Sequence, residues 1–75
     1  MKKVMLRSRI RELRAREGLT QEQLAGVVDV RRETIGHIEH GRYNPSLILA
    51  YLISRALKST IEDVFSFHEG ESQDG

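Results

Sequence analysis

The sequence predicts a small all-α domain built from five short helices. Apolar residues recur at helical spacing along most of the chain, capping boxes open two of the predicted helices, and glycines close two of them. With 75 residues and a mass of 8.6 kDa, the chain accommodates one domain. A domain of this size buries only about 60% of the surface that its unfolded chain exposes, so it often relies on a partner subunit.

The first two helices are bounded by their capping residues. Gly18 ends the first helix, because the C-cap position favours a residue with positive φ. Thr20, with Gln23 three residues later, is a capping box that opens the second helix at Gln21, and we expect this helix to end near Asp29. The apolar stripes of the two helices comprise Leu6, Ile10 and Leu13 in the first and Leu24, Ala25 and Val28 in the second.

The third and fourth helices follow in the middle of the chain. The third is predicted over residues 31–40, and Gly41 closes it. After a turn at residues 43–46, Ser46 caps a fourth helix over residues 47–57. Both faces of the fourth helix are largely apolar, which predicts that it is the central helix of the bundle.

The C-terminal end changes character twice. Thr60 repeats the capping pattern and opens a short fifth helix through about Phe65. Residues 65–68 alternate apolar and polar, which is the period of a strand. The remainder is acidic and poor in apolar residues, so we predict one domain over residues 1–68 and a flexible acidic tail over residues 69–75.

Charge is unevenly distributed along the chain. Residues 1–60 hold all 12 Lys and Arg against six acids, a net charge of +6, whereas residues 61–75 hold five acids and no Lys or Arg. A basic body favours a polyanionic partner such as nucleic acid. A well-solvated surface explains the charge alone equally well.

Several function classes lack the residues that they need. The chain has no cysteine, which excludes disulfides and thiolate chemistry, and it has no catalytic triad, phosphate loop or paired acids, so we expect no enzymatic activity. His37 and His40 lack a carboxylate or thiolate to complete a ligand set, so we expect no metal and no cofactor. No apolar run approaches the roughly 18 residues of a membrane span, and we expect a cytoplasmic protein with no membrane partner.

The second and third helices match the pattern of a helix-turn-helix. They are short and joined by a turn of three or four residues. The residues expected inside the angle between them are Ala25, Val30, Ile35 and Ile38. The residues expected outside are Arg32, Glu33, Gly36, His37 and His40. This outer face lacks apolar side chains and is rich in hydrogen-bonding groups, which are the groups that read base edges in the major groove.

The segment from LTQEQLA to IEDVF resembles the XRE family, the Cro and phage-repressor type of helix-turn-helix domain. The match covers residues 9–65 and is carried by LTQEQLA, the Glu39–Gly41 pair, NPSL and IEDVF. The short stand-alone bacterial and archaeal members are similar in length and are homodimers. The resemblance implies a lambda-repressor-like fold, a short antiparallel β-ribbon formed by the two chain ends, and a transcriptional regulator that binds a palindromic operator in double-stranded DNA, as a repressor, in homodimeric form.

The resemblance also implies roles for individual residues. Base-facing positions of the third helix are held by Arg32, Glu33 and His37, and Arg31 at the start of this helix is also expected to contact DNA. Phosphate contacts are expected from Gln21, Thr34, Arg42 and Asn44. Arg14 and Glu39 match a pair that forms an internal salt bridge in several members.

Three positions depart from the family pattern or leave two readings open. Asp29 stands where the turn usually carries Gly, a conformation that Asp adopts at modest cost. Arg31 stands where a Ser or Thr cap is usual, so roughly 1 kcal/mol of capping is lost. Glu33 either favours the helix N-terminus electrostatically or accepts a hydrogen bond from a cytosine.

The two phenylalanines near the C-terminus predict a dimer contact. Phe65 and Phe67 flank a segment without other large apolar neighbours, so we expect both to lie between two copies of the chain. The alternative function is a protein-interaction module, such as an antitoxin or a restriction–modification controller. Its acidic tail would engage a basic protein partner, which the sequence does not identify.

Overall fold

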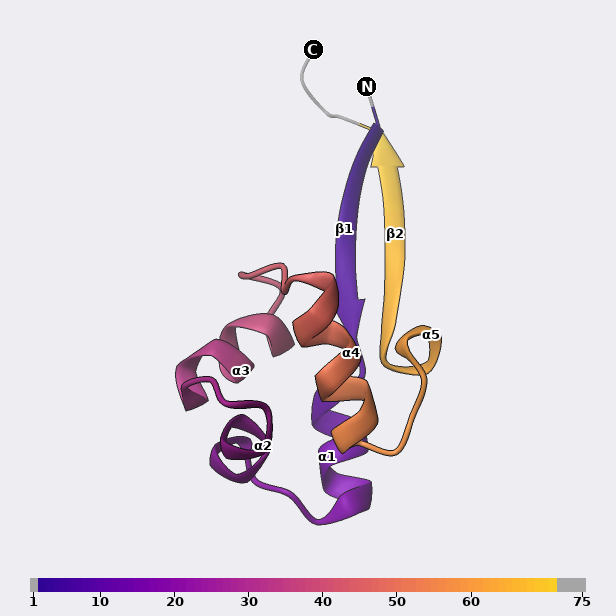
Figure 1. The fold of residues 1–75 in the computed structure, drawn as a ribbon. Coiled ribbons are helices and arrows are strands. Elements are labelled where there is room, and N and C mark those ends of the chain that lie inside the picture. Colours follow the sequence, from indigo (N-terminus) through magenta and orange to yellow (C-terminus); the bar gives the residue numbers. More distant parts are fainter. Residues whose placement is uncertain (1, 72–75) are drawn as a thin grey trace.

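The computed structural model describes residues 2–71. It confirms the predicted five-helix fold and the antiparallel ribbon of the two chain ends, which projects from the helical body (Figure 1). The elements in chain order are β1 (Lys2–Ser8), α1 (Ile10–Glu17), α2 (Gln21–Val28), α3 (Arg32–Glu39), α4 (Leu47–Ala56), α5 (Ile61–Val64) and β2 (Phe65–Glu71).

The predicted caps define the helix ends. The Thr20 hydroxyl accepts a hydrogen bond from the Gln23 backbone N–H at 3.0 Å, and the Gln23 side chain accepts one from the Thr20 backbone N–H at 2.9 Å. The Ser46 hydroxyl accepts from the Leu49 N–H at 3.1 Å, and a second capping box opens α5. Gly18 adopts the left-handed conformation at the end of α1, with φ 69°. Local sequence signals therefore fix where each helix begins or ends.

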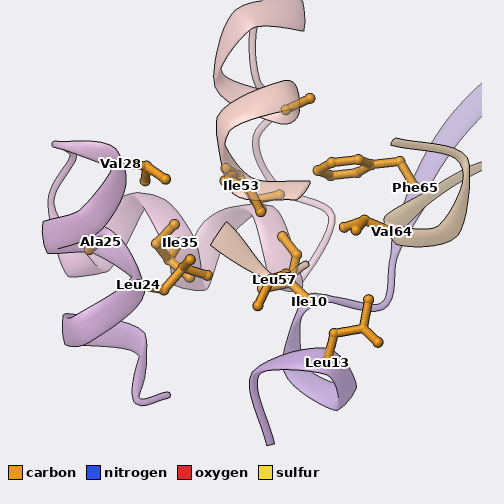
Figure 2. Close-up of a cluster of buried hydrophobic side chains, with 12 residues drawn as sticks. Ile10, Leu13, Leu24, Ala25, Val28, Ile35, Ile53, Leu57, Val64 and Phe65 are labelled. Carbon is orange, nitrogen blue, oxygen red and sulfur yellow. The ribbon is translucent and has the colours of Figure 1, made fainter. Parts of the chain in front are cut away.

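One hydrophobic core joins all five helices to the start of β2 (Figure 2). Its buried members are Ile10, Leu13, Leu24, Ala25, Val28, Ile35, Ile38, Ala50, Ile53, Leu57, Val64 and Phe65. Ile53 of α4 is fully buried and lies between the side chains of the helix-turn-helix and those of Val64 and Phe65. The core therefore fixes the helix-turn-helix relative to the ribbon.

As expected of a central helix, α4 packs between α2 and α5, but the burial of both its faces that the sequence predicts is wrong. Its inner face is buried through Ala50, Ile53 and Ser54. The opposite face, here called the outer face of α4, is exposed and comprises Leu47, Ile48, Tyr51 and Leu52. Two apolar faces predicted burial on both sides, but the described chain covers only one of them.

The ribbon is longer than the sequence pattern predicts. Its register runs from Ser8 opposite Phe65 to Lys2 opposite Glu71. The acidic tail therefore does not begin at residue 69, because residues 69–71 pair with β1. The rest of the predicted tail, residues 72–75, lies outside the described residues. Leu6, predicted on the stripe of the first helix, belongs to β1 and packs against the core from there.

Phe65 and Phe67 have different environments. Phe65 is only 6% exposed and packs into the core beside Val64 (Figure 2), whereas Phe67 is 74% exposed. The expectation that both rings lack an intrachain partner is therefore wrong for Phe65. The two residues share one face of β2, but Phe67 lies two positions further from the body, about 6.6 Å along the strand.

Candidate nucleic-acid interface

The turn between α2 and α3 has the conformation that a helix-turn-helix needs. Asp29 adopts a left-handed backbone, with φ 61° and ψ 47°, and its N–H donates to the Ala25 carbonyl. Asp therefore takes the conformation for which the family usually uses Gly. Ala25 and Ile35 are buried where the two helices pack, whereas Val30 is half-buried, so the inside of the angle is as expected.

The opposite face of α3 is exposed and polar. It is formed by Arg32, Glu33, His37 and His40, which are called here the polar face of α3. Within the described chain no other element covers these side chains. Three of the four hold the base-facing positions implied by the family resemblance, and all of them carry groups that donate or accept hydrogen bonds.

A chain of polar contacts links this face to the interior. Arg14 Nε of α1 lies 2.8 Å from Glu39 Oε2 near the end of α3, so the ion pair expected from the resemblance is present. The Gln21 Nε2 amide donates to Glu39 Oε1 at 3.0 Å, and Arg32 Nη1 donates to Gln21 Oε1 at 3.3 Å. Arg14 also donates to the Leu19 carbonyl at 2.9 Å. The chain therefore runs from α1, through the first residue of α2, to the first residue of α3.

Sequence reasoning missed this second role of Gln21. The residue was expected to contact a phosphate, but both ends of its amide already engage protein groups. The Glu39 carboxylate is buried, with 5% of its side chain exposed, and a buried carboxylate needs several donors. No local signal in the sequence shows this contact, because Glu39 lies 18 positions from Gln21.

The remaining candidate residues surround the N-terminal half and the C-terminal end of α3. Arg31 is the N-cap of α3 in extended conformation, and its side chain makes no capping hydrogen bond, as predicted. Thr34 is half-buried on α3, whereas Arg42 and Asn44 are exposed in the loop to α4. Gly41 turns this loop with φ 72°, and the Arg42 N–H donates to the His37 carbonyl at 2.8 Å.

Together these residues place hydrogen-bond donors at both ends of α3. The N-termini of α2 and α3 present backbone N–H groups, which favour anions. Arginines stand before α3, at its start and after its end. Such a surface suits the phosphates of a duplex on either side of a helix whose polar face reaches base edges.

Comparisons with known proteins agree with this geometry. The helix-turn-helix family model HTH_3 matches residues 10–64. An HTH-type transcriptional regulator of Archaeoglobus fulgidus is 58% identical over 66 residues, covering 88% of this chain and 94% of that protein. The HTH-type transcriptional regulator YgzD of Bacillus subtilis is 45% identical over 64 residues, covering 85% of this chain and 97% of that protein.

A solved structure is similar in both fold and sequence. The restriction-modification controller protein C.AhdI of Aeromonas hydrophila superposes with a TM-score of 0.69 at 36% identity, covering 73% of this chain and 83% of that chain. No helix in the described part of the chain has the length and apolar character needed to cross a membrane. The relatives are regulators and not enzymes, and this chain belongs with them to the XRE-type helix-turn-helix family of DNA-binding transcriptional regulators.

Proposed function

We propose that this regulator is a repressor that acts in the cytoplasm and binds a two-fold symmetric operator as a homodimer. The observation that carries the proposal is the polar face of α3, which is exposed, rich in hydrogen-bonding groups and bordered by arginines. A helix with such a face fits the major groove, where each base pair presents a distinct pattern of donors and acceptors.

The residues divide into readers of bases and anchors on phosphates. The proposed readers are Arg32, Glu33 and His37, with Arg31 beside them at the helix start. The proposed anchors are Gln21, Thr34, Arg42 and Asn44. Gln21 has a further part, because its contact with Arg32 holds that guanidinium at the start of α3. Repression then requires only that the bound dimer cover a promoter.

A restriction–modification controller is a second candidate function. It is favoured by the 36% identity to C.AhdI, whose described role is restriction-modification control. This role also requires DNA binding, so the interface stays the same and only the regulated genes differ. A restriction enzyme or methyltransferase gene beside this one supports the second candidate, whereas a toxin gene there supports an antitoxin.

The proposal is tested by binding the chain to its own promoter region at several salt concentrations. If phosphate contacts drive affinity, the logarithm of the binding constant falls steeply and linearly with the logarithm of salt concentration. Footprinting should then show two protected half-sites about 34 Å apart, one turn of duplex.

A matched pair of arginine variants locates the interface. Arg42→Ala should reduce the salt slope by about 1. Arg11→Ala, which removes an exposed arginine from α1 outside the proposed interface, should leave the slope unchanged. Binding that is insensitive to salt, or equal effects of the two variants, would contradict the assignment of this surface to DNA.

A further inference from the structure

We infer that His40, at the C-terminal end of α3, contacts a DNA phosphate and that this contact forms only when the imidazole ring is protonated. The inference rests on the proposed function and adds to it one residue and a dependence on pH. His40 belongs to the polar face of α3, but in the proposed function it is neither a reader nor an anchor.

The ring of His40 is held by the last turn of α3. Its Nδ1 atom lies 2.8 Å from the carbonyl oxygen of Gly36, and the backbone N–H of His40 donates to the same oxygen at 3.1 Å. A carbonyl oxygen only accepts hydrogen bonds, and its two lone pairs allow it to accept both of these. Nδ1 therefore carries a hydrogen, which fixes the tautomer of the neutral ring.

This tautomer decides what His40 presents to a ligand. With the hydrogen on Nδ1, the Nε2 atom of the neutral ring has a free lone pair and can only accept. A phosphate oxygen is also an acceptor, so the neutral ring cannot bond to it. Once the ring is protonated, Nε2 donates from a positively charged group and can form a charge-assisted hydrogen bond with a phosphate. Contact with the DNA backbone therefore requires each copy to take up one proton at Nε2.

The place of His40 on α3 suits a phosphate better than a base. His40 follows Arg32 by eight positions on the same face, which is about 12 Å along a helix. The major groove is also about 12 Å wide, so when Arg32 stands at base edges, His40 reaches the backbone at the side of the groove. The next turn supports this placement, because Arg42, a proposed anchor, donates its N–H to the His37 carbonyl at 2.8 Å.

The other two histidines do not share this constraint. Within the described chain, the rings of His37 and His68 make no hydrogen bond to protein groups. A free neutral ring can carry its hydrogen on whichever nitrogen faces a ligand, so it can donate without taking up a proton. Contacts through His37 therefore do not depend on protonation, and the dependence on pH is assigned to His40.

The charged groups near His40 leave its Nε2 to an external partner. The adjacent carboxylate, that of Glu39, is buried and bound by Arg14 of α1 and Gln21 of α2. Further charged side chains on α3, on the loop after it and on the elements packed against it include Glu33, Arg42, Glu22 and Asp29 of α2, and Lys3 and Arg7 of β1. Within residues 2–71, none of them forms an ion pair with His40. A phosphate would therefore be the first anion to meet this ring.

The test measures the affinity of the full chain for a half-site duplex at constant salt concentration and varying pH. His40→Gln keeps a neutral donor that does not titrate in this range, and His40→Lys keeps a permanent positive charge. His68→Gln is the matched control, because it removes an exposed histidine of β2 outside the proposed interface. Far-UV circular dichroism checks that each variant is folded.

We expect the wild type and His68→Gln to bind about 5-fold more tightly at pH 6 than at pH 8, because binding is linked to the uptake of a proton. His40→Gln should lose most of this dependence. His40→Lys should bind more tightly than His40→Gln and with little dependence on pH. A wild type whose affinity does not change with pH overturns the inference, and so does a His40→Gln variant that keeps more than half of the wild-type dependence.

Two further measurements separate this inference from the proposed function. In the free chain at about pH 8, the nitrogen chemical shifts of His40 should be those of the Nδ1–H tautomer, and an Nε2–H tautomer overturns the inference without any DNA. Calorimetry in two buffers of different ionisation enthalpy should detect proton uptake when the wild type binds and little when His40→Gln binds. Salt-dependent binding without proton uptake overturns only the inference. Absence of binding by the wild type at every pH overturns the proposed function, and the inference with it.

Discussion

The helices α3 and α4 bury similar stripes but expose opposite chemistries. Each packs fully buried isoleucine against the core, Ile35 in α3 and Ile53 in α4. On the exposed side, α3 carries arginine, glutamate and histidine, whereas α4 carries leucine, isoleucine and tyrosine. The buried stripes determine the fold, and the exposed stripe of α3 has the hydrogen-bonding groups that suit a duplex.

The largest loss of stability is expected from truncating the buried isoleucine that each of the two helices packs into the core. Ile35→Ala and Ile53→Ala should each lower the free energy of unfolding by about 2–5 kcal/mol, because both leave a cavity in a closed core. Urea unfolding measures the loss. The milder Ile→Val changes, expected to cost about 0.5–1.5 kcal/mol, keep the comparison measurable if the Ala variants do not fold. A loss below 1 kcal/mol in either Ala variant would mean that its stripe is not part of the core.

The next largest loss of stability is expected from breaking the ion pair that joins α3 to α1. Removing one member of the Arg14–Glu39 pair leaves a poorly solvated charge, so Arg14→Met and Glu39→Gln should each cost about 2–3 kcal/mol of unfolding free energy. The double variant should recover part of that loss in a double-mutant cycle. Strictly additive costs would show that the two side chains do not interact in solution.

A smaller change, in the discrimination between operator sequences, tests whether the polar face of α3 reads bases. Arg32→Ala should cost about 1–3 kcal/mol at particular base pairs in a panel of operator variants. Because Gln21 holds Arg32, Gln21→Ala should reproduce part of this loss of discrimination. Arg32→Ala should therefore cost less in the Gln21→Ala background. Equal costs in both backgrounds would show that the contact does not position Arg32.

Substitutions at the N-cap positions of α3 and α4 should change the free energy of unfolding in opposite directions. Ser46 caps α4, so Ser46→Ala should lower the unfolding free energy by about 1 kcal/mol. Arg31 occupies the same position of α3 without a capping hydrogen bond, so Arg31→Ser should raise it by about 0.5–1 kcal/mol while weakening DNA binding. Thermal unfolding and operator binding of the two variants check both signs. A less stable Arg31→Ser would show that Arg31 supports the fold.

The smallest change in stability is expected from the exposed Arg9–Glu12 pair, which lies outside α3 and α4. The side-chain hydrogen bond from Arg9, and then its positive charge, lower the pKa of Glu12 from its ordinary value of 4.5. A carboxylate with a lowered pKa stabilises the fold above pH 4.5, and this contribution disappears as the pH falls further. Since 65% of the Glu12 side chain is exposed to solvent, Glu12→Gln should flatten the acid limb of the stability profile only slightly. A large change would indicate a further partner for Glu12.

Local signals in the sequence account for most of the fold. The cap of α2 at Thr20, the end of α1 at Gly18 and the buried stripes of α2 and α3 were predicted, because each depends on residues within one or two turns of one another. The exposed outer face of α4 was not predicted. Periodicity shows that a face is apolar, but it does not show whether the same chain or another one covers it.

The difference in burial between Phe65 and Phe67 could not be predicted from local sequence, because it depends on long-range contacts. Alternation correctly placed Phe65 and Phe67 on one strand face, but only the pairing with β1 shows that Phe65 stands at the root of the ribbon. The same limit applies to the polar contacts of Gln21. Its partners Glu39 and Arg32 lie 18 and 11 positions away, and their distances depend on how the helices pack.

The ribbon gives the folding of this chain an expected order in time. Its strands join residues separated by roughly 60 positions. The chain must therefore lose the conformational entropy of that long loop before strand pairing can compensate for the loss. The helices, whose contacts are local, are expected to form on a microsecond scale and to shorten the loop as they pack. The strands then pair last and open first. Since β1 and β2 carry the exposed side chains of Val4 and Phe67, these two apolar groups come together on the ribbon only after the helices have folded.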